Sequence, residues 1–393
     1  MMQGMSQGFR RHVPLQHGAA LAAALWVVLW AGAAAQAVAS DAARSDPTRS
    51  DSTRSDSISA EEWLTRMNDA LTTRNYEGTF FHVRPQGVET LRIVHRVKDG
   101  ETKERLVSLD GSGREFIHDR GELICYLPDQ RKVLVERGRQ NGSLLGAVPR
   151  FDSSISGSYE IKGGERERLM GRDARLVIVH PRDEYRYGYR LWIDERTAMP
   201  LKTQLCDSVG NVVEQVVFSS LTMRSEIPDS AFKPDVQAEG FRWVRQEVDS
   251  PELAKMPVLW HALRLPPGFR MASRIHQALP GAASPVAHLV FTDGVASVSV
   301  FVEAASATNR DGVQSSLTGA RRVGASAAFS TTVNGHQVTA VGEVPLQTVQ
   351  FIASQVKFES SSAATPAATP AATPMRRKPN PPPAGVPALA PRN

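Results

Sequence analysis

The stretch 185–205 constrains the fold more than any other part of the sequence. Aromatic or apolar side chains occupy alternate positions from Tyr185 to Ile193, and mostly polar or small residues stand between them. This period of two predicts a β-strand with one apolar face. A polar turn at 194–198 and renewed alternation from Leu201 to Leu205 predict an antiparallel partner strand. A sheet with one apolar face needs a cover, which can be a helix, a second sheet or a lipid.

The chain begins with the pattern of a secretory signal peptide. Arg10 and Arg11 precede an apolar run over residues 19–35, and small residues up to position 39 offer a cleavage site. The alternative is an uncleaved membrane anchor, but the run is barely long enough to span a bilayer. We therefore expect residues 1–39 to be removed and the mature protein to be exported and soluble.

Charge gives no support to a nucleic-acid-binding function. The formal net charge is +5, but two of the basic residues lie in the signal and four in the tail, so the remainder is nearly neutral. Residues 40–58 repeat Arg-Ser-Asp with almost no apolar side chains, which predicts a solvated linker. Residues 359–393 are rich in Pro and Ala and are expected to form a disordered tail.

Residues 59–232 are expected to form the larger domain. Ser59 and Glu62 have the spacing of a capping box, and an apolar stripe at helical spacing predicts an amphipathic helix ending near Asn75. The remainder reads as short strands separated by turn clusters, at 78–83, 89–97, 104–109, 115–118, 122–127, 132–136, 159–162, 174–180, the 185–205 hairpin and 212–221. About ten antiparallel strands and one long helix predict an open barrel with a helical lid.

A second, smaller α+β domain is expected at residues 254–358, after a linker at 233–253 that contains Pro-rich turns. Asp293-Gly294 and Asn334-Gly335 each separate two apolar runs, a strong signal for a β-hairpin. A helix is expected to start at Pro345, because apolar residues then recur at helical spacing.

Several segments carry a family resemblance in their order and spacing. They are NYEGTF at 75–80, GVETLRIVHR at 87–96, YRYGYRLWIDERTAMPLK at 185–202, LPPGF at 265–269, FTDGVASVSVFVE at 291–303, TGARRVGAS at 318–326 and VGEVPLQTVQFIASQVKF at 341–358. Through these segments the chain from about Ser59 to Phe358 resembles the MucB/RseB family of periplasmic regulators of the envelope-stress sigma factor. The resemblance implies a large domain similar to the lipoprotein carriers of the envelope, an unclosed antiparallel half-barrel with an apolar concave side, beside the smaller domain.

The resemblance also implies a function by binding. Proteins of this family bind the periplasmic segment of a transmembrane anti-sigma factor of the RseA/MucA type, shield it from site-one proteolysis and so keep a sigma factor of the sigma-E/AlgU type inactive. In this family, lipid, lipopolysaccharide or mislocalised lipoprotein is thought to weaken the binding of the anti-sigma segment. A protease needs an extended substrate, so occupying the segment would remove the cleavable conformation. We therefore expect a periplasmic regulator; the sequence leaves self-association open.

The residues themselves nominate no catalytic, metal or cofactor site. The histidines are scattered without metal-ligand spacing, and P-loop, nucleophile-elbow and zinc-protease motifs are absent. An enzyme is not expected, although a triad assembled across a fold leaves no spacing signal, so a hydrolase with an unusual site stays an alternative. A carrier chaperone that ferries lipoproteins or lipids in the half-barrel is the other alternative, and the second domain counts against it.

Two sets of residues are candidates for contact with a ligand or a partner. Tyr76, Phe80, Tyr185, Tyr187 and Tyr189 are aromatic side chains of the sheet that could line a lipid cavity or belong to the core. Arg321 and Arg322 could contact an acidic peptide or a lipid phosphate, or could be a solvated pair.

Cys125 and Cys206 are the only cysteines, and in an exported protein they could form a disulfide. The strand phases indicate opposite faces of the sheet, because Cys125 shares its face with Leu123 and Leu127, whereas Cys206 shares its face with Lys202 and Gln204. The alternative is one buried thiol and one partly exposed thiol.

Overall fold

The computed structural model describes residues 58–359, except for 112, 138–142, 146–147, 149, 152, 248–250, 280–281, 283 and 305–317. The expected signal peptide, nearly all of the repeat linker and the Pro/Ala-rich tail lie outside the described residues. None of the described helices is long and apolar enough to cross a membrane.

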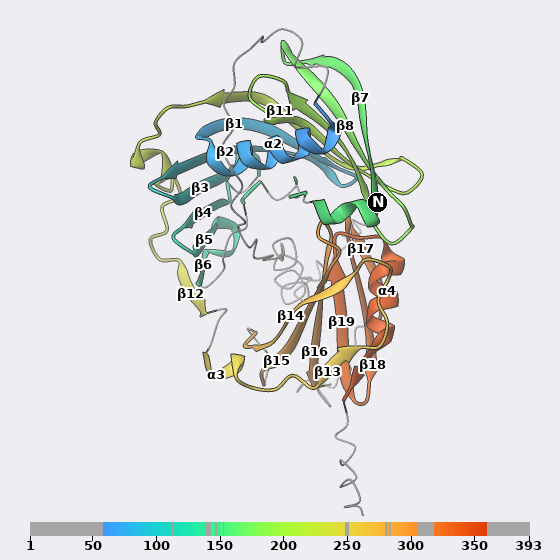
Figure 1. Ribbon diagram of the computed structural model, residues 1–393. Helices are drawn as coiled ribbons and strands as arrows, with labels where there is room; N and C mark the ends of the chain where they lie inside the picture. Colours follow the sequence, from blue (N-terminus) through green and yellow to red (C-terminus); the bar gives the residue numbers. More distant parts are fainter. Residues whose placement is uncertain are drawn as a thin grey trace, which may run out of the picture. The chain divides into compact units, whose positions relative to one another are not determined.

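A twelve-stranded sheet forms the first lobe, residues 58–247 (Figure 1). Its strands are β1 (Tyr76–Arg84), β2 (Gly87–Lys98), β3 (Glu101–Ser108), β4 (Glu115–Asp119), β5 (Glu122–Leu127), β6 (Lys132–Arg137), β7 (Tyr159–Leu169), β8 (Arg172–Pro181), β9 (Gly188–Asp194), β10 (Pro200–Cys206), β11 (Val212–Met223) and β12 (Arg242–Glu247). Short 3-10 turns lie at η2 (Pro128–Gln130), η3 (Ser153–Gly157) and η4 (Asp229–Phe232).

The strands of this sheet pair in the order β12-β6-β5-β4-β3-β2-β1-β11-β10-β9-β8-β7. All neighbours are antiparallel except β12, which pairs in parallel with β6. The two outer strands, β12 and β7, do not pair with each other, so the barrel is open and the predicted fold class is confirmed. The strand β12 lies inside the segment 233–253 that the sequence suggests is a linker, and it extends the sheet.

The hairpin at 185–205 begins later than the alternation predicts. Strand β9 starts at Gly188 because the Asp183 side chain accepts a hydrogen bond from the Tyr185 amide at 3.0 Å, which folds the chain into a turn. Both faces of β9 are buried, and Asp194 at its end is buried with Thr197 and Arg172 as hydrogen-bond donors. The predicted apolar face is buried in the core through Tyr189, Leu191 and Ile193, but the alternation did not predict that the opposite face would be buried as well.

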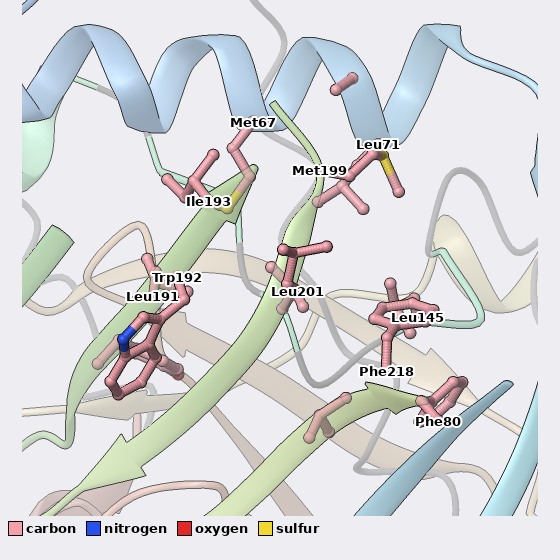
Figure 2. Close-up of a cluster of buried hydrophobic side chains, with 14 of the residues drawn as sticks. Met67, Leu71, Phe80, Leu145, Leu191, Trp192, Ile193, Met199, Leu201 and Phe218 are labelled. Atoms are coloured by element: carbon pink, nitrogen blue, oxygen red, sulfur yellow. The ribbon is translucent and has the colours of Figure 1, made fainter. Parts of the chain in front are cut away.

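Helix α2 (Ala60–Thr73) provides the predicted cover for part of the sheet. It starts as a capping box predicts, because Ser59 Oγ accepts a hydrogen bond from the Glu62 amide at 3.1 Å. Its buried residues are Trp63, Leu64, Met67, Ala70 and Leu71. Figure 2 shows Met67 and Leu71 pointing from the helix toward Ile193, near the end of β9, and Met199, which directly precedes β10.

The second lobe, residues 251–359, contains a six-stranded sheet in the order β14-β15-β16-β19-β18-β17. Its strands are β14 (Arg270–Gln277), β15 (Val286–Thr292), β16 (Ser297–Ala304), β17 (Gly319–Val323), β18 (Ser326–Val333) and β19 (His336–Gly342), with β13 (Trp260–Ala262) paired to β20 (Val356–Phe358). Helix α3 (Pro251–Ala254) precedes them, and α4 (Leu346–Gln355) lies along β18 and β19 (Figure 1). Both predicted hairpins, β15–β16 and β18–β19, are present.

We expect Met67→Ala to lower the free energy of unfolding by about 2–5 kcal/mol, because Met67 is fully buried between α2 and the sheet. Thr65→Ala, on the exposed face of the same helix, is the matched control and should change it by less than about 0.5 kcal/mol. Urea unfolding followed by circular dichroism measures both. Equal effects of the two variants would contradict the packing of α2 on the sheet.

Candidate functional site

A cavity of about 120 Å³ lies against strands β1–β4 and β9–β11 of the first lobe. Its apolar wall is formed mainly by Phe80, Leu91, Leu106, Phe116, Leu144, Leu145, Tyr189, Leu205 and Val216. Apolar cavities of roughly 150 Å³ admit a molecule the size of benzene. The cavity therefore has room for a short apolar group, and a whole acyl chain would have to push its wall outward.

A buried carboxylate positions the loop that closes part of this wall. Glu104 on β3 accepts hydrogen bonds from Ser143 Oγ and from the Leu144 amide, each at 2.7 Å. These bonds hold Leu144 and Leu145 at the cavity. Burial raises the pKa of Glu104 to about 7, and the two hydrogen bonds oppose that rise.

Polar side chains line another part of the same cavity. His82 Nε2 lies 2.8 Å from Glu214 Oε2, and Arg84 contacts both His82 Nδ1, at 2.9 Å, and Glu89, at 3.2 Å. Burial alone would raise the pKa of Glu214, but hydrogen bonds from His82 and from a backbone amide of the second lobe outweigh it and lower that pKa. Burial, reinforced by the charge of Glu214, raises the pKa of Glu343 to about 7. The cavity thus combines an apolar wall with a charged rim.

Glu214 also holds a turn of the second lobe; residues up to Phe358 belong to one compact unit. Its Oε1 accepts a hydrogen bond from the Ala325 amide at 2.6 Å. Ala325 is fully buried within the hydrophobic cluster of the first lobe. Gly324 has φ +60°, and a Cβ built on it would lie 2.2 Å from Glu214 Oε1, so only glycine permits this close approach. The β17–β18 turn is therefore anchored beside the cavity.

A second anchor between the lobes is the buried guanidinium of Arg186. It donates to both oxygens of Asp183, at 2.9 and 3.0 Å, to Asp293 Oδ2 at 2.6 Å and to the Pro267 carbonyl. The Tyr159 hydroxyl donates to the same Asp293 oxygen at 2.9 Å. The side chains of Arg186 and Asp293 are both 0% exposed. Three of the family-like segments, at 185–202, 265–269 and 291–303, therefore meet at one buried charge.

The five aromatic candidates are not brought together in one cavity. Phe80 and Tyr189 line it. Tyr76 is buried and stacks on His95, with ring centroids 4.7 Å apart. The ring centroids of Tyr185 and of Phe351 on α4 lie 5.7 Å apart.

The hydroxyl of Tyr187 accepts a hydrogen bond from Arg322 at 2.8 Å. Arg321 and Arg322 are both exposed on β17. Arg322 is thus a contact between the lobes as well as a surface residue, while Arg321 remains a candidate for partner contact.

The two cysteines are not joined to each other in the structure. Both are buried, which differs from the expected pair of one buried and one partly exposed thiol. Cys125 lies on β5 and Cys206 on β10, and five strands separate β5 from β10 in the sheet. Neighbouring strands are about 4.8 Å apart, whereas a disulfide needs Cα atoms within about 7 Å.

Sequence reasoning missed the residues that join the lobes. Arg186 occupies a polar position of an expected alternating strand, and Asp293 is part of a turn signal, so neither stands out locally. Glu214 and Glu343 carry no motif. The signal available in the sequence was that Arg186, Pro267 and Asp293 all lie within segments that resemble the family. Within the described residues, no group of His, Cys, Asp and Glu could hold a metal ion.

Comparisons with known proteins agree with this architecture. The MucB/RseB N-terminal domain matches residues 59–236, and the MucB/RseB C-terminal domain matches residues 254–357. The chain therefore belongs to the MucB/RseB family, and the earlier resemblance is confirmed.

Among individual relatives, the sigma factor AlgU regulatory protein MucB of Pseudomonas aeruginosa is 30% identical over 307 residues, which cover 77% of this chain and 92% of that protein. The sigma-E factor regulatory protein RseB of Escherichia coli is 28% identical over 303 residues, covering 75% and 89%. The crystal structure of MucB in complex with MucA(peri) superposes with a TM-score of 0.59 at 27% identity and covers 77% of this chain and all of that chain. The complex structure of Pseudomonas aeruginosa MucA/MucB superposes with a TM-score of 0.57 at 29% identity and covers 77% of this chain and 99% of that chain.

We expect Arg186→Gln to lower the free energy of unfolding by about 3–5 kcal/mol, because it leaves the buried Asp293 carboxylate without its cation. Arg66→Gln removes an exposed ion pair with Glu62 on α2 and should cost less than about 1 kcal/mol. Urea unfolding measures both. A loss at Arg186 no larger than at Arg66 would contradict the assignment of Arg186 as the joint between the lobes.

The raised pKa of Glu343 predicts a pH dependence of stability. The folded protein binds this proton more tightly than the unfolded chain, so its contribution is full below the usual pKa of 4.5 and is lost as pH rises through about 7. Glutamine at position 343 cannot ionise. The free energy of unfolding of Glu343→Gln, relative to that of wild type, should therefore rise by on the order of 1–3 kcal/mol between about pH 5 and pH 8. Glu239→Gln, on the surface, is the control. A stability difference for Glu343→Gln that does not change with pH would refute the assignment.

Proposed function

We propose that this chain is a periplasmic negative regulator that binds the periplasmic segment of a transmembrane anti-sigma factor of the RseA/MucA type. The observation that carries the proposal is the likeness, over both lobes, to MucB solved in complex with MucA(peri). The named relatives are sigma factor regulatory proteins, which supports a role in regulation and a non-enzymatic function. The signal-peptide pattern at residues 1–39 supports a periplasmic location.

Binding would act by denying a protease its substrate. A site-one protease needs the anti-sigma segment in an extended conformation within its own active site, and a segment held on this protein cannot adopt it there. The sigma factor would therefore stay inactive as long as the complex lasts.

A lipid signal would act through the cavity of the first lobe. Its apolar wall suits part of an acyl chain, and its charged rim includes Glu214, which holds the Gly324–Ala325 turn of the second lobe. Because the cavity is small, an acyl chain would have to displace wall and rim groups. That displacement would loosen the contact between the lobes and lower the affinity for the partner.

A carrier chaperone for lipids or lipoproteins is the second candidate, and the apolar cavity favours it. A carrier would copurify with stoichiometric lipid and hand it to an acceptor. The buried joint at Arg186 counts against it, because a simple carrier needs no second lobe fixed to its barrel.

In a protection assay, the mature protein should shield the recombinant periplasmic segment of its anti-sigma factor from the activated site-one protease in a saturable way. Lipopolysaccharide or an acylated lipoprotein fragment should reverse the protection. Absence of both binding and protection, with lipid copurifying, would overturn the regulator proposal and favour the carrier.

Narrowing the cavity tests whether it receives the lipid. Val216→Phe fills the cavity and should leave partner binding intact while raising the lipid concentration needed for release at least about tenfold. Val217→Phe is the matched control, because adjacent residues of a strand point to opposite faces. Equal lipid responses of the two variants would exclude the cavity as the lipid site.

A further inference from the structure

The edge strand β17 of the second lobe has an open side. Its inner edge pairs with β18 at all five positions without a shift in register. Within the described part of the chain, no strand pairs with its outer edge, and all five of its residues are exposed. An unpaired strand edge is a template for an added strand, because its amide and carbonyl groups lack partners.

The turn geometry identifies which backbone groups face outward. Gly324, at the first central position of a two-residue turn, has φ +60°, whereas Ala325 at the second does not have a positive φ, and this combination is that of a type II′ hairpin. The flanking pair, Val323 and Ser326, then exchanges hydrogen bonds, and such pairs alternate along the ladder. The amide and carbonyl groups of Ala320 and Arg322 therefore point away from β18 and offer an incoming strand its hydrogen bonds.

Two other edge strands, β7 and β14, are less suited to receive a strand. The edge strand β7 has an irregular register between Gly163 and Arg166, and alternating charges follow along it. The edge strand β14 has an irregular register between Met271 and Ser273 and contacts α3. Irregularities and charges of this kind protect edges from pairing, whereas β17 is regular and lacks Pro, Asp, Glu and Lys.

The charge on β17 indicates the kind of segment that fits. Arg321 and Arg322 project to opposite faces of the strand, as successive residues do. Neither forms an ion pair with another described residue, and the described hydrogen-bond partner of Arg322 is the neutral hydroxyl of Tyr187. Two guanidinium groups without carboxylate partners attract acidic side chains on an added strand.

We infer that the outer edge of β17 binds an extended, acidic peptide segment as an added strand, with the Ala320 and Arg322 backbone as its hydrogen-bond partners and Arg321 and Arg322 as its charge contacts. This inference rests on the proposed function and identifies the anti-sigma segment as the occupant. It also links the edge to the cavity, because the turn that follows β17 is held by Glu214 and Arg322 is held by Tyr187. Movement of Glu214 would shift the strand that carries the partner.

Proline at position 320 tests the added strand directly. Ala320→Pro removes an outward amide while sparing the ladder with β18, so it should weaken binding of the recombinant periplasmic anti-sigma segment at least about tenfold. Ala320→Val keeps the amide and should bind within about twofold of wild type. The double variant Arg321→Glu with Arg322→Glu should also weaken binding and reduce its dependence on salt. Calorimetry or fluorescence anisotropy measures each affinity.

Hydrogen exchange in the wild-type complex gives a readout that does not depend on the variant folding. The amides of Ala320 and Arg322 should exchange more slowly when the segment is bound, resolved by NMR. If the wild type binds the segment but these amides exchange at an unchanged rate, the edge assignment is wrong and the proposed function stands. The same conclusion follows if Ala320→Pro and Ala320→Val bind the segment with equal affinity. Absence of any wild-type binding would overturn the proposed function and the assigned occupant together. A wild-type dimer that Ala320→Pro abolishes would show that the edge pairs with a second copy, which also overturns the assignment.

Discussion

The buried charge of Arg186 is the interaction on which the arrangement of the two lobes depends. A guanidinium removed from water is costly unless carboxylates and carbonyls replace its hydration, and Asp183, Asp293 and the Pro267 carbonyl do so here. Such a network contributes less to net stability than an apolar core would, but it fixes geometry, because another placement of the lobes would separate Arg186 from Asp293 and the Pro267 carbonyl. The lobes are thus joined at a defined point rather than by a flexible tether.

Because the lobes are fixed to each other at Arg186, the contact that Glu214 makes between them can transmit a change from the cavity to the second lobe. Glu214 belongs to the rim of the cavity and also accepts the Ala325 amide of the second lobe, so one carboxylate serves both features. If the lobes were loosely attached, a change at the cavity would dissipate in their relative motion. With Arg186 holding one point, displacement of Glu214 would strain or break its hydrogen bond with the Ala325 amide in the β17–β18 turn. A short physical chain therefore runs from the cavity through Glu214 to the strand edge that we assign to the partner.

Local patterns predicted much of the fold because the physics behind them is local. The Ser59 capping box and the apolar stripe of α2, and the Asp293-Gly294 and Asn334-Gly335 turns, involve residues within a few positions of each other. The site was less predictable. Arg186 and Asp293 are 107 positions apart, and no periodicity encodes their meeting. Among the aromatic candidates, Phe80 and Tyr189 reach the cavity, whereas Tyr185 turns toward α4 because the Asp183 turn delays the strand.

The central claim is that the cavity and the partner site are coupled, and thermodynamic linkage tests it most directly. The affinity for the anti-sigma segment would be measured by calorimetry with and without saturating lipopolysaccharide, and the affinity for lipopolysaccharide with and without the segment. Coupling requires both affinities to fall by the same factor, which we expect to be about tenfold, because the coupling free energy between two sites is reciprocal. If the affinity for each ligand is the same with and without the other ligand, the cavity and the partner site are not coupled.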